Sequence, residues 1–133
     1  MPNKGEIQMS MPMITLTNGL RIANFSSPHP FNFEDGSVLP ACDPERVKRG
    51  SLDVTEEEFC GIKSTIDIKI TFSISESVAE MLEEAQSSEA DVVLVPFPVL
   101  NAMRDEGRNL GKFRVVRIKD RQTKEVHIDR FCI

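Results

Sequence analysis

Cations gather in the last quarter of this sequence of 133 residues. Residues 101–133 carry nine Lys and Arg against five Asp and Glu, a net charge of +4, whereas residues 1–100 carry seven against sixteen, a net charge of −9. Because arginine forms bidentate hydrogen bonds to phosphate and carboxylate groups, this density favours an anion site. The predicted ligand-binding residues are Arg104, Arg114, Arg117, Lys119 and Arg121, together with Phe97 and His29.

The segment after Val95 would position this site. Ligands of parallel sheets bind beyond the carboxyl ends of the strands, where helix N-termini present free backbone N–H groups. Pro96 and Pro98 remove two of these donors and no glycine-rich phosphate loop follows, which weakens the segment as a phosphate cradle. The expected ligand is an anionic small molecule such as a nucleotide. The alternative is that these cations bind no ligand and only form a solvated face or protect a strand edge from pairing.

A second group of residues has the types that nucleophilic catalysis needs. Cys42 or Ser27 would be the nucleophile, His29 the base, and Asp35 or Asp43 the orienting group. Their spacing matches no nucleophile elbow and no papain-like pattern. A small hydrolase that uses His29 with Cys42 or Ser27 is therefore the alternative to a non-enzymatic protein.

The sequence predicts no metal site and no cofactor. Its three cysteines, Cys42, Cys60 and Cys132, form no CxxC pair, and its two histidines belong to no HExxH motif. All eight aromatic residues are Phe, so the Trp and Tyr platforms for sugars and single-stranded nucleic acid are missing. The acidic net charge also repels phosphate backbones, so nucleic-acid binding is not expected.

Local patterns predict two β-hairpins, one toward each end of the chain. In residues 13–25, a three-residue loop ending at a left-handed Gly19 would place Ile14 opposite Ile22 on one apolar face. Residues 112–118 and 124–131 are predicted as strands around a turn at 120–123. Between residues 26 and 65 the pattern disappears, except for a short helix that Asp43 would cap and Gly50 would end.

The stretch 66–95 predicts a strand, a helix and a second strand. Apolar residues alternate with polar ones from Ile66 to Ile74, which is typical of a strand with one buried face. Ser73 and Glu76 have capping-box spacing, and apolar residues follow at helical offsets at Val78, Met81, Leu82 and Ala85. The apolar run 92–95 predicts a strand buried on both faces, so the three elements would form a parallel βαβ crossover.

A further helix is expected between the prolines at 96 and 98 and Gly107, with an apolar face at Val99, Leu100, Ala102 and Met103. Together these elements predict an α+β fold. It is a single domain at residues 13–133, with a mixed β-sheet, two β-hairpins, a central βαβ crossover and two main helices. Residues 1–12 are predicted as a flexible N-terminal arm or leader.

The composition of the chain predicts its cellular location. No apolar run approaches the roughly 18 residues of a membrane span, and the first residues do not resemble a signal peptide, so a cytosolic location without a membrane is expected. Exposed strand edges and separated charges predict a homo-oligomer. The expected function is a small non-enzymatic binding protein for an anionic small molecule or a protein partner. A virus-encoded sequestering or host-interfering role is one hypothesis.

Overall fold

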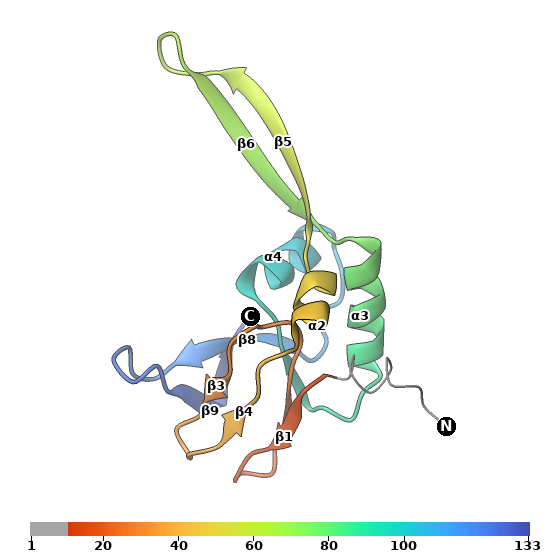
Figure 1. Ribbon diagram of the computed structural model, residues 1–133, viewed down its shortest axis with the longest axis vertical. Coiled ribbons are helices and arrows are strands. Elements are labelled where there is room, and N and C mark those ends of the chain that lie inside the picture. The colour runs from red at the N-terminus through yellow and green to blue at the C-terminus, as the bar shows by residue number, and fades with distance from the viewer. Residues whose placement is uncertain (1–10) are drawn as a thin grey trace.

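A five-stranded mixed sheet forms the centre of the molecule in a computed structural model that describes residues 11–133 (Figure 1). Its strands are β1 (Met13–Thr15), β2 (Arg21–Asn24), β7 (Val92–Leu94), β8 (Phe113–Ile118) and β9 (Val126–Cys132), in the order β1-β2-β7-β8-β9. The three inner strands are parallel, and each outer strand is antiparallel to its neighbour. The predicted α+β fold with a mixed sheet is confirmed.

Seven further elements complete the described part of the chain. They are β3 (Phe31–Asn32), β4 (Val38–Leu39), α2 (Pro44–Arg49), β5 (Asp53–Cys60), β6 (Ile66–Ser73), α3 (Glu76–Gln86) and α4 (Phe97–Asp105). The strand pairs β3–β4 and β5–β6 form separate two-stranded sheets. The second pair rises away from the body as a long hairpin (Figure 1).

The β1–β2 hairpin has the predicted register. Ile14 lies opposite Ile22, and the Leu16 N–H donates to the Leu20 carbonyl at 2.8 Å. Gly19 has φ of 87°, the left-handed conformation that the three-residue loop requires. At the other end of the chain, β8 and β9 form the second predicted hairpin.

The parallel crossover lies further along the chain than the sequence predicts. The placement at residues 66–95 is wrong, because β6 pairs with β5 in the antiparallel sense and not with β7. The crossover is instead β7–α4–β8, in which Val93 lies opposite Phe113. The alternation that begins at Ile66 does form a strand, but its apolar face is exposed, because its neighbour is β5 and not the core.

Both main helices bury the predicted faces. Val78, Met81, Leu82 and Ala85 are buried on α3, and Val99, Leu100, Ala102 and Met103 are buried on α4. The cap of α3 differs from the prediction, because Ser75 and not Ser73 accepts the hydrogen bond from the Val78 N–H. Ser73 is still paired with Asp53 in the long hairpin, so the helix begins only after it.

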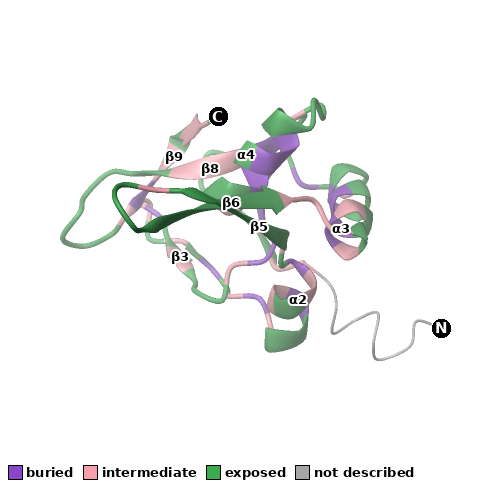
Figure 2. Ribbon diagram, turned by 90° about the horizontal axis from the view of Figure 1, so that it is seen from above, coloured by how far each residue is buried: buried purple, intermediate pink, exposed green. Residues whose placement is uncertain are grey.

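The central sheet separates two apolar cores. On one face, α3 and α4 cover Phe25, Val93 and Phe113, with Phe25 and Phe113 in edge-to-face contact at 6.3 Å between ring centroids. On the other face, Ile22 and Leu94 pack against Phe33, Leu39 and Val126, from the β3–β4 segment and β9. This burial contrasts with the long hairpin, whose strands are exposed along almost their whole length (Figure 2).

The irregular stretch after β2 is held by buried polar side chains. Asn24 donates to the carbonyls of Ser27 and Pro40, and the Arg46 Nε donates to the Phe25 carbonyl at 2.7 Å. Asp35 accepts hydrogen bonds from Thr17 and Ser37; burial opposes them, yet they lower the pKa of this carboxyl to about 2. The stretch is therefore tied to both β2 and the first hairpin.

Two expectations concern the start of the chain and the membrane. The predicted N-terminal arm falls mostly on residues 1–10, outside the described residues, whereas Met11 packs against the helix-side core and the Pro12 carbonyl accepts from the Asn24 N–H at 2.9 Å. Among the described residues, none of the helices combines the length and apolarity needed to cross a bilayer.

Candidate functional site

The structure distributes the five predicted anion-binding cations over α4, β8 and the β8–β9 turn. Arg114 directs its guanidinium to the carbonyls of Gly111 and Phe113 at 2.9 and 2.7 Å. The Lys119 Nζ lies 3.8 Å from the Glu34 carboxylate, and Arg104, Arg117 and Arg121 are exposed. None of the five lines any of the three cavities described below.

Ser27 and Asp43 use their side chains to bind the backbone. The Ser27 hydroxyl accepts from the His29 N–H and donates to the His29 carbonyl, both at 3.1 Å. Asp43 caps α2 by accepting from the Arg46 N–H at 2.8 Å, which confirms the predicted cap. Within residues 11–133, no hydrogen bond joins the His29 imidazole to the side chain of Ser27 or Cys42.

Cys42 has the environment of a structural thiol. It is buried, and its Sγ donates to the Asn24 carbonyl at 3.3 Å. Burial raises the pKa of this thiol to about 11, although the nearby Arg46 acts in the opposite direction. A nucleophilic cysteine requires a depressed pKa and some exposure. This geometry therefore does not support the hypothesis of a hydrolase with Cys42 as its nucleophile.

A cavity does lie beyond the carboxyl end of β7, where the sequence predicts a ligand site. It has a volume of about 290 Å³, and Phe97 and Ser27 are among its lining residues. The other lining residues are apolar: Pro28, Phe31, Leu94, Val95, Pro96, Val115 and Val116. The structure therefore places Phe97 at the predicted edge of the sheet but places none of the predicted cations there. An anion in this cavity would have no charged side chain as a partner.

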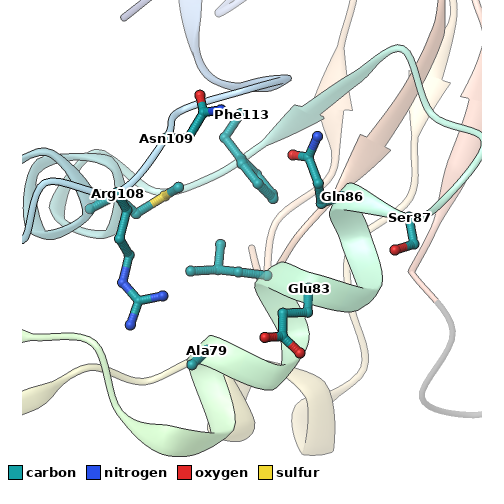
Figure 3. Close-up of a pocket in the computed structure, with 9 residues that line it drawn as sticks. Ala79, Glu83, Gln86, Ser87, Arg108, Asn109 and Phe113 are labelled. Atoms are coloured by element: carbon teal, nitrogen blue, oxygen red, sulfur yellow. The ribbon is translucent and has the colours of Figure 1, made fainter.

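A larger cavity of about 560 Å³ lies between α3 and the segment that follows α4 (Figure 3). Leu82, Met103 and Phe113 contribute apolar surface to it, whereas Glu83 and Arg108 contribute opposite charges. Arg108 also lies 3.6 Å from Glu106, Nε to Oε1, so its charge is already partly balanced. The sequence does not indicate this cavity, because its residues come from a helix face and a loop that only tertiary packing brings together.

The most prominent surface of the described chain is the long hairpin formed by β5 and β6 (Figures 1 and 2). Its register places four cross-strand pairs on one face: Val54 with Phe72, Glu56 with Ile70, Glu58 with Ile68, and Cys60 with Ile66. Ile66, Ile68 and Ile70 are 62%, 55% and 53% exposed. Six of the eight side chains on this face are apolar or thiol groups, and they contact water instead of a core.

The opposite face of the long hairpin is mostly polar. It carries the pairs Asp53 with Ser73, Thr55 with Thr71, Glu57 with Lys69, and Phe59 with Asp67. The sequence did not reveal β5, because three consecutive glutamates at 56–58 give it a poor β-propensity and hide its alternation. The regular alternation in β6 predicts a strand with one buried face, whereas both faces of β6 are exposed.

The base of the long hairpin is attached to α4. The Ile74 N–H, just after β6, donates to the Glu106 carboxylate at 2.8 Å. A groove of about 480 Å³ between β6 and α4 is lined by Ile70, Phe72, Phe97 and Asp105 among others. This groove extends the apolar face of the hairpin onto the body and adds the exposed Phe97 to the same surface.

Isolated two-stranded hairpins are marginally stable in water, and exposed contiguous apolar surface is typical of interaction sites. The long hairpin combines both features with two strand edges that pair with no further strand among the described residues. Its geometry suits protein recognition, because a partner can cover the apolar face and pair with an edge. Comparison with known proteins finds no match for this chain among protein-family models, curated proteins or solved structures.

Proposed function

We propose that this protein is a non-enzymatic binding protein that recognises a partner protein through the long hairpin. The observation that carries the proposal is the exposed apolar face of β6, which continues through the groove to Phe97. A face of this kind is costly to leave in water, and each isoleucine that a partner covers contributes about 1.5–3 kcal/mol.

The charges of the hairpin define the chemistry of the partner. Residues 53–73 contain five acids and two lysines, a net charge of −3. Glu56 and Glu58 lie on the same face as Ile68 and Ile70, so the acids border the apolar strip directly. A complementary partner therefore presents an apolar strip bordered by Lys or Arg. The same acids disfavour face-to-face pairing of two copies of the hairpin, because four glutamates would meet without cations.

The other expectations drawn from the sequence stay predictions. They are an anionic small-molecule ligand, a homo-oligomeric state, a cytosolic location and a viral origin. A second copy of this chain becomes the favoured partner only if the purified protein associates with itself. In that case the basic segment at residues 101–133 is the complementary surface, because its net charge is +4.

The test removes the apolar face while the β-propensity of the strand is kept. The variant Ile68→Thr/Ile70→Thr is compared with the wild type as bait in cells of its natural origin, and a protein enriched by the wild type is identified by mass spectrometry, purified and titrated. We expect the variant to bind at least about 100-fold more weakly, since two buried isoleucines are lost.

A matched control changes the opposite face of the same two strands. Thr55 and Phe59 lie on that face and line none of the three cavities, so Thr55→Ser/Phe59→Thr alters as many residues without touching the apolar face, the groove or the charge of the hairpin. This control should retain the affinity of the wild type. Equal affinity of all three proteins for the purified partner, or no enriched partner and no self-association of the wild type, would refute the proposal.

A further inference from the structure

Three metal-ligating side chains meet where β9 passes the turn between β3 and β4. Glu34 follows β3, whereas His127 and Asp129 lie two residues apart on β9 and so project from the same side of that strand. A parallel bridge between Phe33 and Val126 and the Glu34 N–H bond to the Val126 carbonyl hold the two segments together. One ligand atom from each of the three residues lies within 4.8 Å of the others.

The Glu34 carboxylate has an unusual environment. Its Oε2 is buried from solvent and lies 3.1 Å from the His127 Nδ1, yet it accepts no hydrogen bond. At this distance, a direct histidine–carboxylate hydrogen bond would point the ring N–H at the oxygen. Two ligand atoms that lie close together without pointing at each other are the arrangement expected when both face a third, shared position.

We propose that Glu34, His127 and Asp129 bind a divalent transition metal ion, with Zn²⁺ as the best-suited ion. The preferred zinc–nitrogen and zinc–oxygen distances are about 2.0–2.2 Å. Because no two of the ligand atoms are more than 4.8 Å apart, an ion midway between any two would lie within about 2.4 Å of both, so a small side-chain movement completes the site. One imidazole with two carboxylates favours such an ion over Mg²⁺ and Ca²⁺, which prefer ligand sets made only of oxygen.

Two cations beside the site have to give way to the metal. The Lys119 Nζ lies 3.8 Å from the Glu34 Oε2, and the Arg130 Nε lies 3.9 Å from Asp129. Both ion pairs involve exposed cations, and exposed ion pairs contribute little free energy. The metal replaces them at small cost, and Lys119→Gln should therefore tighten metal binding rather than weaken it.

The experiment is a Zn²⁺ titration of the full chain by calorimetry, in a background carrying Cys60→Ser and Cys132→Ser so that accessible thiols do not bind zinc. We expect one ion per chain, and His127→Gln should weaken the affinity at least about 100-fold. His29→Gln is the matched control, because His29 is the other histidine and is not part of the cluster. It should bind zinc as the background protein does.

A second variant covers the possibility that His127→Gln does not fold. Asp129 is exposed, so Asp129→Asn should leave the circular dichroism spectrum unchanged while it weakens zinc binding about tenfold or more. Zinc should also raise the Tm of the background protein and of His29→Gln, but not that of His127→Gln. Absence of saturable binding, or binding that both His127→Gln and Asp129→Asn retain in full, would overturn the proposal.

Discussion

At the scale of single residues, chemistry and structure compete for the same side chains. Ser27, Cys42 and Asp43 are residue types that catalysis uses, but each is occupied in holding an irregular backbone segment. Ser, Asn and Asp side chains often bond to nearby backbone groups outside helices and sheets. The residues that the sequence suggested for a hydrolase are therefore explained by the local structure of residues 24–46.

Cys42 allows this interpretation to be tested. With a pKa raised by burial to about 11, its thiol is protonated near neutral pH. In iodoacetamide labelling at pH 7.5, followed by mass spectrometry, we expect Cys42 to react at least about tenfold more slowly than the exposed Cys60. Labelling in guanidinium chloride is the control, since unfolding should abolish the difference. Rapid labelling of native Cys42 would instead support a hydrolase with Cys42 as its nucleophile.

At the scale of elements, the long hairpin differs from the strands and main helices of the body. The helices α3 and α4 and the central strands bury apolar faces in one of two cores, whereas β5 is exposed at all eight positions and β6 at all but its last. Its backbone is ordered by pairing between the two strands and by the Glu106 contact at its base. A partner would therefore meet an element whose direction from the body is already defined.

Because the long hairpin buries almost nothing, its removal should leave the body folded. We expect replacement of residues 55–71 by a short Gly-Ser turn to change the free energy of unfolding by less than about 1 kcal/mol, the scale of surface changes. Urea unfolding followed by circular dichroism measures this quantity. As a control, Phe113→Ala should be strongly destabilising, because Phe113 is fully buried. A body that fails to fold without the hairpin would show that the hairpin is a structural element.

At the scale of the whole molecule, one sheet connects two cores. Phe113 belongs to the helix-side core and Phe33 to the core beneath β3, β4 and β9, and β2, β7 and β8 contribute residues to both. Because the same three strands form part of both cores, unfolding of one core would also disrupt the other. The described fold should therefore unfold as one cooperative unit.

Two cavity-forming variants test this cooperativity. Phe113→Ala and Phe33→Ala should each lower the free energy of unfolding by about 3–5 kcal/mol, because both side chains are buried on opposite faces of the sheet. Circular dichroism in the near and far ultraviolet should follow the same single transition in both variants. Separate transitions in either variant would show that the two cores are independent units.

The sequence by itself determined the elements whose cause is local. The first hairpin register follows from its loop and Gly19, the cap of α2 follows from Asp43, and the buried faces of α3 and α4 follow from apolar residues at helical spacing. Period-2 alternation also identified β6, and the turn at 120–123 between two predicted strands identified the last hairpin. These features depend on backbone preferences and nearest neighbours, which a sequence carries directly.

Only the tertiary structure decided which apolar faces are buried and which polar groups meet. The alternation in β6 is identical whether its partner is the core or water, so the sequence could not show that this face is free. Glu34 and His127 are 93 positions apart in the sequence. They meet only because β9 lies beside the segment that follows β3, where Phe33 and Val126 form a bridge. The parallel crossover lies at β7–α4–β8 and not at residues 66–95 for the same reason. Strand pairing depends on long-range contacts that no local pattern encodes.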